Sequence, residues 1–302
     1  MGYKRAGFEV IGNVEIDSRI NQVYVKNLHP RHNYCMDLRE FNRLDNLPAE
    51  LYELDILDGS PPCTTFSIAG KREENWGKEK KFTEGQKLQR LDDLFFVWFE
   101  TLAKLRPKIA IAENVIGLIQ GNARGYVTEI IKDFKSLGYD VQLFRLNAAF
   151  MDVPQLRERV FFIGNNQYYS PLKLDFNGRL IKFGEIRTEH GKPTSEGKTI
   201  KLLSQVSLKD NRISDITRRL EGKSRGYGRP IMHDDKVALT LLTKTAYRAC
   251  DKMRLSDGDI INVSTFPQDY DFCGRSVQYI CGMSVPPNMM ANIASEVKRQ
   301  WL

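Results

Sequence analysis

The stretch DGSPPCTTFSIAG, residues 58 to 70, decides how this sequence is interpreted. It follows the short apolar run 54–57 (LDIL), and an apolar run that stops at glycine and proline is typical of a buried strand. Residues after such a strand lie at the carboxyl edge of the sheet, where α/β proteins bind ligands. Cys63 stands directly behind two prolines, which restrict its backbone. The segment therefore offers a candidate nucleophile, although a free cysteine is more commonly a buried structural residue.

Strand and helix patterns alternate on both sides of this stretch. We expect strands at 8–16, 34–36, 54–57, 108–112, 139–146 and 159–163, and helices at 18–27, 91–105 and 125–137. This alternation predicts an α/β fold with a doubly wound, mostly parallel, Rossmann-like sheet.

The second half of the chain has a different pattern. Residues 165–250 contain many short turns and no long helix pattern, which predicts a small, irregular inserted domain. A last helix is expected to start at the prolines 286–287 and to run to about Trp301. The predicted organisation is therefore a main domain in 1–164, an inserted domain in 165–250, and a return to the main domain in 251–302.

The charge distribution indicates a class of partner. The 302 residues are 41% hydrophobic, which is enough to bury a core. The net charge is +7, and residues 165–250 alone hold 17 Lys and Arg against 9 Asp and Glu. A positive segment beside a nearly neutral one suits the phosphate backbone of a nucleic acid. A solvated basic surface would give the same composition.

The cysteines and the hydropathy pattern restrict location and cofactors. Five scattered cysteines form no C-x-x-C pair: Cys35, Cys63, Cys250, Cys273 and Cys281. This argues against a zinc site and a disulfide framework, and it favours a reducing cytoplasm. No apolar stretch approaches membrane-spanning length, and the first residues do not form a secretory signal. We expect a cytoplasmic monomer without a metal or a membrane partner.

Four motifs occur in a fixed order along the chain. They are PPC at 61–63 with FS at 66–67, ENV at 113–115, QLRER at 155–159 and GMSVPP at 282–287. This ordered set resembles the motifs of the cytosine carbon-5 DNA methyltransferases of bacterial or phage type, and it covers nearly the whole chain. The resemblance implies methyl transfer from S-adenosylmethionine to cytosine in double-stranded DNA, in restriction–modification or phage DNA protection. The inserted domain would then recognise the target.

The same resemblance implies catalytic roles for four residues. The thiolate of Cys63 would add to carbon-6 of a flipped-out cytosine, because carbon-5 alone is a poor nucleophile. Glu113 would contact N3 and the exocyclic amine, and it would need a raised pKa to donate a proton. Arg159 would contact the base oxygen, and Arg157 would brace the loop. Since the two arginines are two positions apart, we expect them to point to the same face.

A pocket for the methyl donor is also implied. Glu15 would hold the ribose hydroxyls, and Asp37 would accept from the adenine amine. The other residues expected to line the pocket are Ile16, Leu38, Pro62, Leu94, Ser284 and Val285. The family begins with a strand and a glycine-rich loop, roughly Phe-x-Gly-x-Gly-Gly, that these 302 residues lack. That strand would be central, so its neighbours are expected to miss a hydrogen-bonding partner.

Two other functions fit the same residues. One is a DNA-binding remnant of the family with impaired catalysis, and the other is an RNA cytosine methyltransferase of the same fold. Binding of the methyl donor separates the first from an enzyme. Assays on both nucleic acids separate the second.

Overall fold

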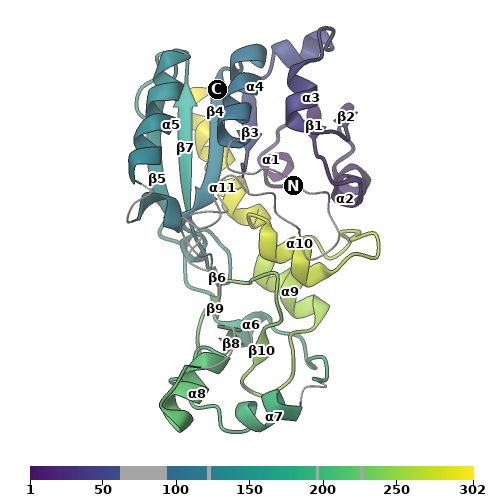
Figure 1. The fold of residues 1–302 in the computed structure, drawn as a ribbon, viewed down its shortest axis with the longest axis vertical. Coiled ribbons are helices and arrows are strands. Elements are labelled where there is room, and N and C mark those ends of the chain that lie inside the picture. Colours follow the sequence, from purple (N-terminus) through teal and green to yellow (C-terminus); the bar gives the residue numbers. More distant parts are fainter. Residues whose placement is uncertain (62–93, 121–123, 195–196, 225–227) are drawn as a thin grey trace. The chain divides into compact units, whose positions relative to one another are not determined.

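The computed structural model describes residues 1–61, 94–120, 124–194, 197–224 and 228–302 (Figure 1). Contacts divide these residues into two units. The sheet unit comprises Glu9–Leu146, Glu158–Leu174 and Arg299–Leu302. The insert unit comprises Met1–Phe8, Asn147–Arg157 and Asp175–Lys298. These bounds differ from the predicted segments 1–164, 165–250 and 251–302, whose functional assignment stays a prediction.

The described strands of the sheet unit form two hydrogen-bonded sets. A parallel pair consists of β1 (Gly12–Val14) and β2 (His32–Tyr34). A four-stranded sheet has the order β3 (Ile56–Gly59), β4 (Ile109–Val115), β7 (Glu158–Asn165) and β5 (Asp140–Asn147). β3 and β4 are parallel, whereas β4 and β7 are antiparallel. The predicted α/β fold is confirmed.

Helices cover one face of the four-stranded sheet (Figure 1). α4 (Leu94–Leu105) and α5 (Arg124–Ser136) contribute aromatic and aliphatic side chains to the main core. Ala110 and Ala112 of β4 and Phe162 of β7 meet them there, all with 0% exposure. The alternate residues Ile109 and Ile111 are also fully buried. A strand buried on both faces explains why the β4 sequence is continuously apolar up to Glu113.

The β1–β2 pair joins the same unit through its own core. Phe41, Leu51 and Leu105 pack there against apolar residues that flank β1, β2 and β3. α2 (Ser18–Leu28) begins after the N-cap Asp17, and α3 (Leu38–Asn42) begins after the N-cap Asp37. Short 3₁₀ turns occupy Ala49–Tyr52 and Ile116–Ile119. Each aspartate accepts a backbone N–H of the first turn, which fixes where the chain leaves its strand.

Apart from α11 (Pro287–Trp301), the insert unit consists of short elements, as expected for residues 165–250. Its pairs β6 (Gln155–Leu156) with β9 (Ala238–Leu239) and β8 (Ile231–Met232) with β10 (Tyr247–Arg248) are each two residues long. The helices are α1 (Gly2–Arg5), α6 (Phe183–Ile186), α7 (Gly197–Leu203), α8 (Ile213–Glu221), α9 (Asp257–Ser264) and α10 (Val277–Met283), with a 3₁₀ turn at Ala148–Phe150. α11 (Pro287–Trp301) starts at the predicted proline, and its last three residues belong to the sheet unit.

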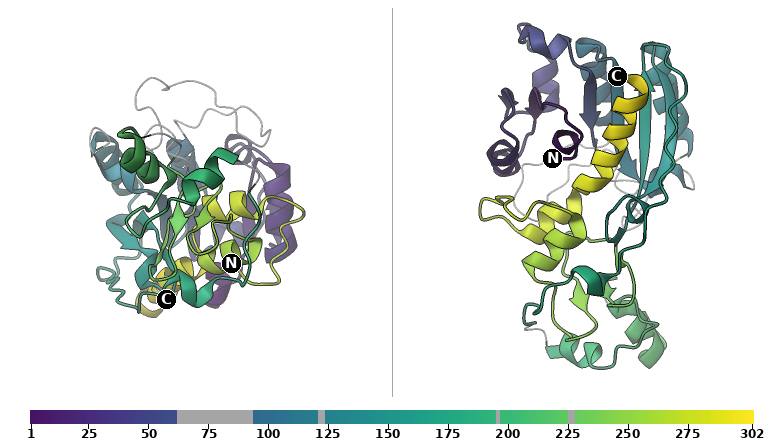
Figure 2. Two further views of the ribbon diagram at one scale, coloured as in Figure 1. Left: turned by 90° about the horizontal axis from the view of Figure 1, so that it is seen from below. Right: turned by 180° about the vertical axis from the view of Figure 1, so that it is seen from behind.

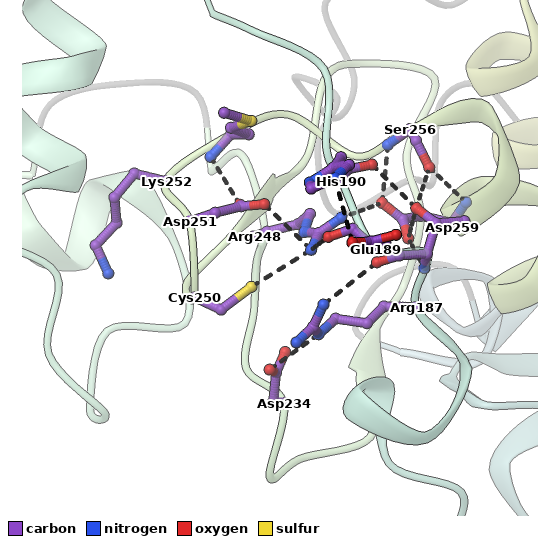
Figure 3. A network of polar contacts seen from close by, with 12 residues as sticks. Arg187, Glu189, His190, Asp234, Arg248, Cys250, Asp251, Lys252, Ser256 and Asp259 are labelled. Atoms are coloured by element: carbon purple, nitrogen blue, oxygen red, sulfur yellow. Dashed lines mark hydrogen bonds and ion pairs between the residues drawn. The ribbon is translucent and has the colours of Figure 1, made fainter.

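A buried ionic network holds the insert unit together (Figure 3). The side chains of Arg248 and Asp259 are 1% and 0% exposed and lie 3.4 Å apart. Asp259 accepts from the backbone N–H groups of Ser256 and Thr188, at 2.8 and 2.7 Å. Arg248 also donates to the carbonyl of Glu189. Because each charged group is paired and hydrogen-bonded, its burial is tolerated, and the network ties α9 to strand β10 and to the segment before it.

Candidate active site

The carboxyl ends of β3 and β4 meet at one edge of the sheet. Gly59 pairs with Ala112, so Glu113 and Asn114 lie level with the residues that follow β3. The amide of Asn114 is buried and donates to the carbonyl oxygen of Pro61 at 3.1 Å. This bond fixes the chain two residues before Cys63. Pro62 and Cys63 themselves lie outside the described residues.

Glu113 and Arg159 form an ion pair at this edge. Arg159 Nε lies 2.8 Å from Glu113 Oε1, and the side chains are only 14% and 12% exposed. The antiparallel register places Arg159 opposite Val115, two residues along β4 from Glu113. Burial lowers the pKa of Arg159, and the neighbouring Glu113 partly offsets this. β4 runs to Val115, so Glu113 lies within the strand rather than after it, and β7 supplies its partner.

Arg157 contacts different partners from those of Arg159. It is 1% exposed and donates to the carbonyl oxygens of Leu241 and Gly282, at 3.1 and 3.0 Å. The expected sharing of one strand face does not apply, because Arg157 lies between β6 and β7 and outside both. An added Cβ at Gly282 would lie 2.5 Å from the carbonyl oxygen of Leu242, so only glycine allows this close approach. A bracing role for Arg157 is consistent with these contacts.

Arg157→Leu is expected to reduce the free energy of unfolding by about 3 kcal/mol, because two buried carbonyls lose a charged donor. Urea denaturation measures the change. Arg145→Leu is the matched control, since its bond to Glu158 is exposed and contributes less than about 1 kcal/mol. Equal effects of the two substitutions would contradict the bracing role.

The two predicted cofactor acids follow the paired strands β1 and β2. Glu15 comes directly after β1, and its carboxylate accepts the N–H of Asp17 at 2.8 Å. Burial raises the pKa of Glu15. Asp37 follows β2, caps α3 and pairs with Arg39 at 3.2 Å. Both acids therefore stand at carboxyl ends of neighbouring parallel strands, where the sequence predicted them.

The predicted site residues are divided between the two units. The sheet unit holds Glu15, Ile16, Asp37, Leu38, Leu94, Glu113 and Arg159. Ile16 is half-buried, Leu38 packs against both cores, and Leu94 is the first residue of α4. The insert unit holds Arg157, Ser284 and Val285. Ser284 ends α10, and its hydroxyl donates to the carbonyl of Ile280 at 2.7 Å.

Of the described cysteines, Cys281 is unsuited to act as a nucleophile. Cys281 is buried, and desolvation raises the pKa of its thiol to about 12, which keeps it protonated. Cys35 and Cys250 are exposed, and Cys273 is half-buried. Within the described ranges, no three His, Cys, Asp or Glu residues gather as a metal site would require. Cys63 remains the predicted nucleophile.

Three structural residues of the site were not recognised from the sequence. Asp17 caps α2, and an aspartate just before a helix pattern is a signal that could have revealed it. Gln155 is buried and bonds to Val263 and Leu241. An added Cβ at Gly59 would lie 2.3 Å from Trp98 Nε1, so this strand end requires glycine. The last two depend on contacts distant in sequence, which no local pattern indicates.

The fold and the strand-end acids define a Rossmann-like α/β protein with the layout of a methyltransferase. Residues 1–225 match the C-5 cytosine-specific DNA methylases. The chain belongs to this family, which makes it a DNA cytosine-5-methyltransferase.

Similar proteins support the family assignment. The chain is 28% identical to the type II methyltransferase M1.HphI of Haemophilus parahaemolyticus, over 98% of this chain and 82% of that one. It is 28% identical to M.Sau96I of Staphylococcus aureus, over 98% and 72%. The match to M.FnuDI of Fusobacterium nucleatum is 35% identical but spans only 54% of this chain and 42% of the relative. A solved DNMT2 structure from Spodoptera frugiperda superposes with a TM-score of 0.67 at 15% identity, over 98% and 95% of the two chains.

The two proteins share the same α/β fold. The right-hand view in Figure 2 shows the present structure from behind, including β5 and β7. Among the described helices, none combines the length and the apolar character needed to cross a bilayer.

Proposed function

We propose that this protein methylates carbon-5 of cytosine in double-stranded DNA through a covalent adduct of Cys63. The observation that supports this most directly is the bond from Asn114 to Pro61. It ties the segment that carries Cys63 to the strand that carries Glu113. A nucleophile, an acid and a guanidinium would thus converge on one base at the carboxyl edge of β3 and β4.

The first chemical step is addition to the ring. The Cys63 thiolate forms a bond to carbon-6, the 5,6 double bond opens, and negative charge develops toward N3. Glu113 protonates N3, while Arg159 orients the Glu113 carboxyl and donates to the base oxygen. Because Arg159 already lies 2.8 Å from Glu113, little reorganisation is needed when the base enters.

The second step is transfer and release. S-adenosylmethionine supplies a methyl group on a sulfonium, which carbon-5 of the activated ring attacks. The donor would leave as S-adenosylhomocysteine. A base, such as a water molecule, then takes the proton from carbon-5, the 5,6 double bond re-forms as the Cys63 thiolate is expelled, and N3 returns its proton to the Glu113 carboxylate. A duplex base must leave the stack to reach this thiol, at a cost of a few kcal/mol. We propose that residues 165–250 hold the duplex and read its sequence during this step.

The strand-end acids fit the methyl donor. Glu15 is half-buried, and one of its carboxylate oxygens accepts the Asp17 N–H, which leaves acceptor capacity for ribose hydroxyls. Asp37 is held by the α3 N-terminus and Arg39, and it would accept from the adenine amine. Ile16, Leu38, Pro62, Leu94, Ser284 and Val285 would complete the pocket.

Glu15→Gln is expected to weaken S-adenosylmethionine binding about tenfold or more, because a charged acceptor for two hydroxyls is lost. Burial raises the pKa of Glu15, so the ionised carboxylate costs folding stability as the pH rises through that pKa. Glutamine removes this cost, and the melting temperature at pH 8 should stay equal or rise. Calorimetric titration and thermal melts measure the two effects. Weaker binding together with a lower melting temperature would indicate misfolding instead.

The biological role we propose is modification of DNA in a restriction–modification or phage system. The type II names of M1.HphI and M.Sau96I support this role. Cytoplasmic conditions would keep the free cysteines reduced.

The test is methyl transfer from labelled S-adenosylmethionine to a duplex DNA library and to RNA, followed by mass spectrometry of the nucleosides. 5-Methylcytosine in DNA supports the proposal. 5-Methylcytosine in RNA alone would show that the protein is an RNA cytosine methyltransferase instead. DNA binding without donor binding would leave a non-catalytic remnant.

A further inference from the structure

A positively charged hollow of about 550 Å³ lies within the insert unit. Its lining includes five cationic side chains and a single acid, Asp257. We call it the basic hollow, and its cations are Lys192, Arg229, Lys244, Arg254 and Arg275. Thr243, Thr245 and Ser276 also line it. A concave site with this excess of cations and hydroxyl donors is suited to an anion.

The charges of the hollow are only partly compensated. Lys192 pairs with Asp257 at 2.6 Å, and Arg229 donates to the hydroxyl of Tyr247 at 2.8 Å. Within the part of the chain that the structure describes, the guanidinium groups of Arg254 and Arg275 have no hydrogen-bond or ion-pair partner. The Nε of Arg275 is moreover buried. A buried guanidinium N–H without an acceptor is unfavourable, and an anion in the hollow would supply that acceptor.

The hollow is built on a fixed frame. Arg254 and Lys192 exchange two backbone hydrogen bonds of 2.9 Å. Leu255 donates to the carbonyl of Ala246 at 3.0 Å. The Arg248–Asp259 network lies next to these residues in the chain and holds α9. A preformed arrangement of donors loses little conformational entropy when a ligand binds.

The basic run 218–229 (RRLEGKSRGYGR) within the inserted segment makes a weaker candidate. Arg218 pairs with Asp215 at 3.6 Å, and Arg219 pairs with the buried Asp210 at 2.6 Å. These two arginines of α8 are therefore already partnered within the unit. Of that run, Arg229 contributes to the basic hollow instead.

We propose that the basic hollow binds phosphate groups of the DNA backbone, with Arg254 and Arg275 as the principal contacts. The inference rests on the proposed DNA methylation and names where this unit holds the duplex. The planar guanidinium matches the two oxygens of a phosphodiester, which makes arginine well suited to such a contact. Contacts of this kind fix the position of the protein on DNA and carry no sequence information.

The test is the double substitution Arg254→Gln and Arg275→Gln in the full chain, with fluorescently labelled duplex DNA in anisotropy titrations. At about 0.1 M salt we expect the Kd to rise about tenfold or more, equally for unrelated sequences. The slope of log K against log salt should fall by about 2, since two phosphate contacts are lost. The matched control, Lys198→Gln with Lys209→Gln, removes the same charge from exposed positions outside the hollow.

Each outcome decides the inference. An unchanged salt slope in the Arg254/Arg275 variant, or a change equal to that of the control, would overturn it while the methyltransferase proposal stands. Micromolar binding of inorganic pyrophosphate that the variant loses, without loss of DNA affinity, would instead assign the hollow to a small phosphate compound. Failure of the unsubstituted chain to bind duplex DNA, measured in the same titration, would overturn the proposed function as well. Circular dichroism confirms that the variants fold.

Discussion

Cys63→Ser is expected to reduce methyl transfer by roughly a thousandfold or more while leaving DNA affinity within a few-fold. Serine is nearly isosteric, but its hydroxyl is far less acidic than a thiol and cannot supply the anion that adds to carbon-6. The duplex would still meet the remaining binding surface, because Cys63 acts only on the extruded base. Turnover with labelled donor and anisotropy with duplex DNA separate the two quantities.

Cys35→Ser is the matched control, since Cys35 is exposed and lies in the sheet unit. It should leave turnover unchanged. A duplex library with 5-fluorocytosine in place of cytosine gives a second readout. In this base, fluorine replaces the carbon-5 hydrogen that would be removed as a proton to release the thiolate. The bond between sulfur and carbon-6 should therefore persist, and the protein–DNA adduct should migrate more slowly on a denaturing gel. Turnover by Cys63→Ser, or an adduct formed by that variant, would rule out the covalent mechanism.

The local hydrophobic pattern of the sequence was sufficient to predict the fold. Short apolar runs alternate with amphipathic segments, and this alternation indicates a sheet covered by helices. The helix predicted at 18–27 is α2, and the helix predicted at 125–137 is α5. The lengths of the strands were predicted less accurately from the sequence. The strand predicted at 8–16 pairs only over Gly12–Val14. Pairing ends where the partner strand ends, and the sequence of one strand does not contain that limit.

The site was predictable only as a set of positions. Glu113 and Arg159 were identified, but their ion pair depends on the register of β4 against β7. The partners of Arg157 are backbone carbonyls of Leu241 and Gly282, far along the chain, and any residue type can supply a carbonyl. The basic hollow could not be predicted from the sequence either, because its cations come from separate segments of the chain. In contrast, Arg218 and Arg219 are adjacent in the sequence, but each forms an ion pair with a nearby aspartate.

Glu113→Gln is expected to lower the turnover rate between about a hundredfold and ten-thousandfold, the range associated with losing a general acid. The amide keeps an oxygen that can accept from Arg159 Nε, so the fold and the position of Arg159 should be preserved. What it loses is the proton that neutralises N3 as the thiolate adds. The rate limit would therefore move to the addition step, and DNA affinity should change little.

The measurement is single-turnover methyl transfer at one fixed pH, with anisotropy titrations for DNA affinity. If Glu113 donates the proton, the single-turnover rate of Glu113→Gln should fall at least a hundredfold, while the Kd for duplex DNA stays within a few-fold. Glu158→Gln is the control. Glu158 is the neighbour of Arg159 on β7, carries the same charge as Glu113, and forms an exposed ion pair with Arg145. A rate within tenfold of that of the unsubstituted enzyme would assign the proton to another group. Glu113 would then serve to hold Arg159 and the base in place, since the 2.8 Å ion pair would remain its main interaction at the sheet edge.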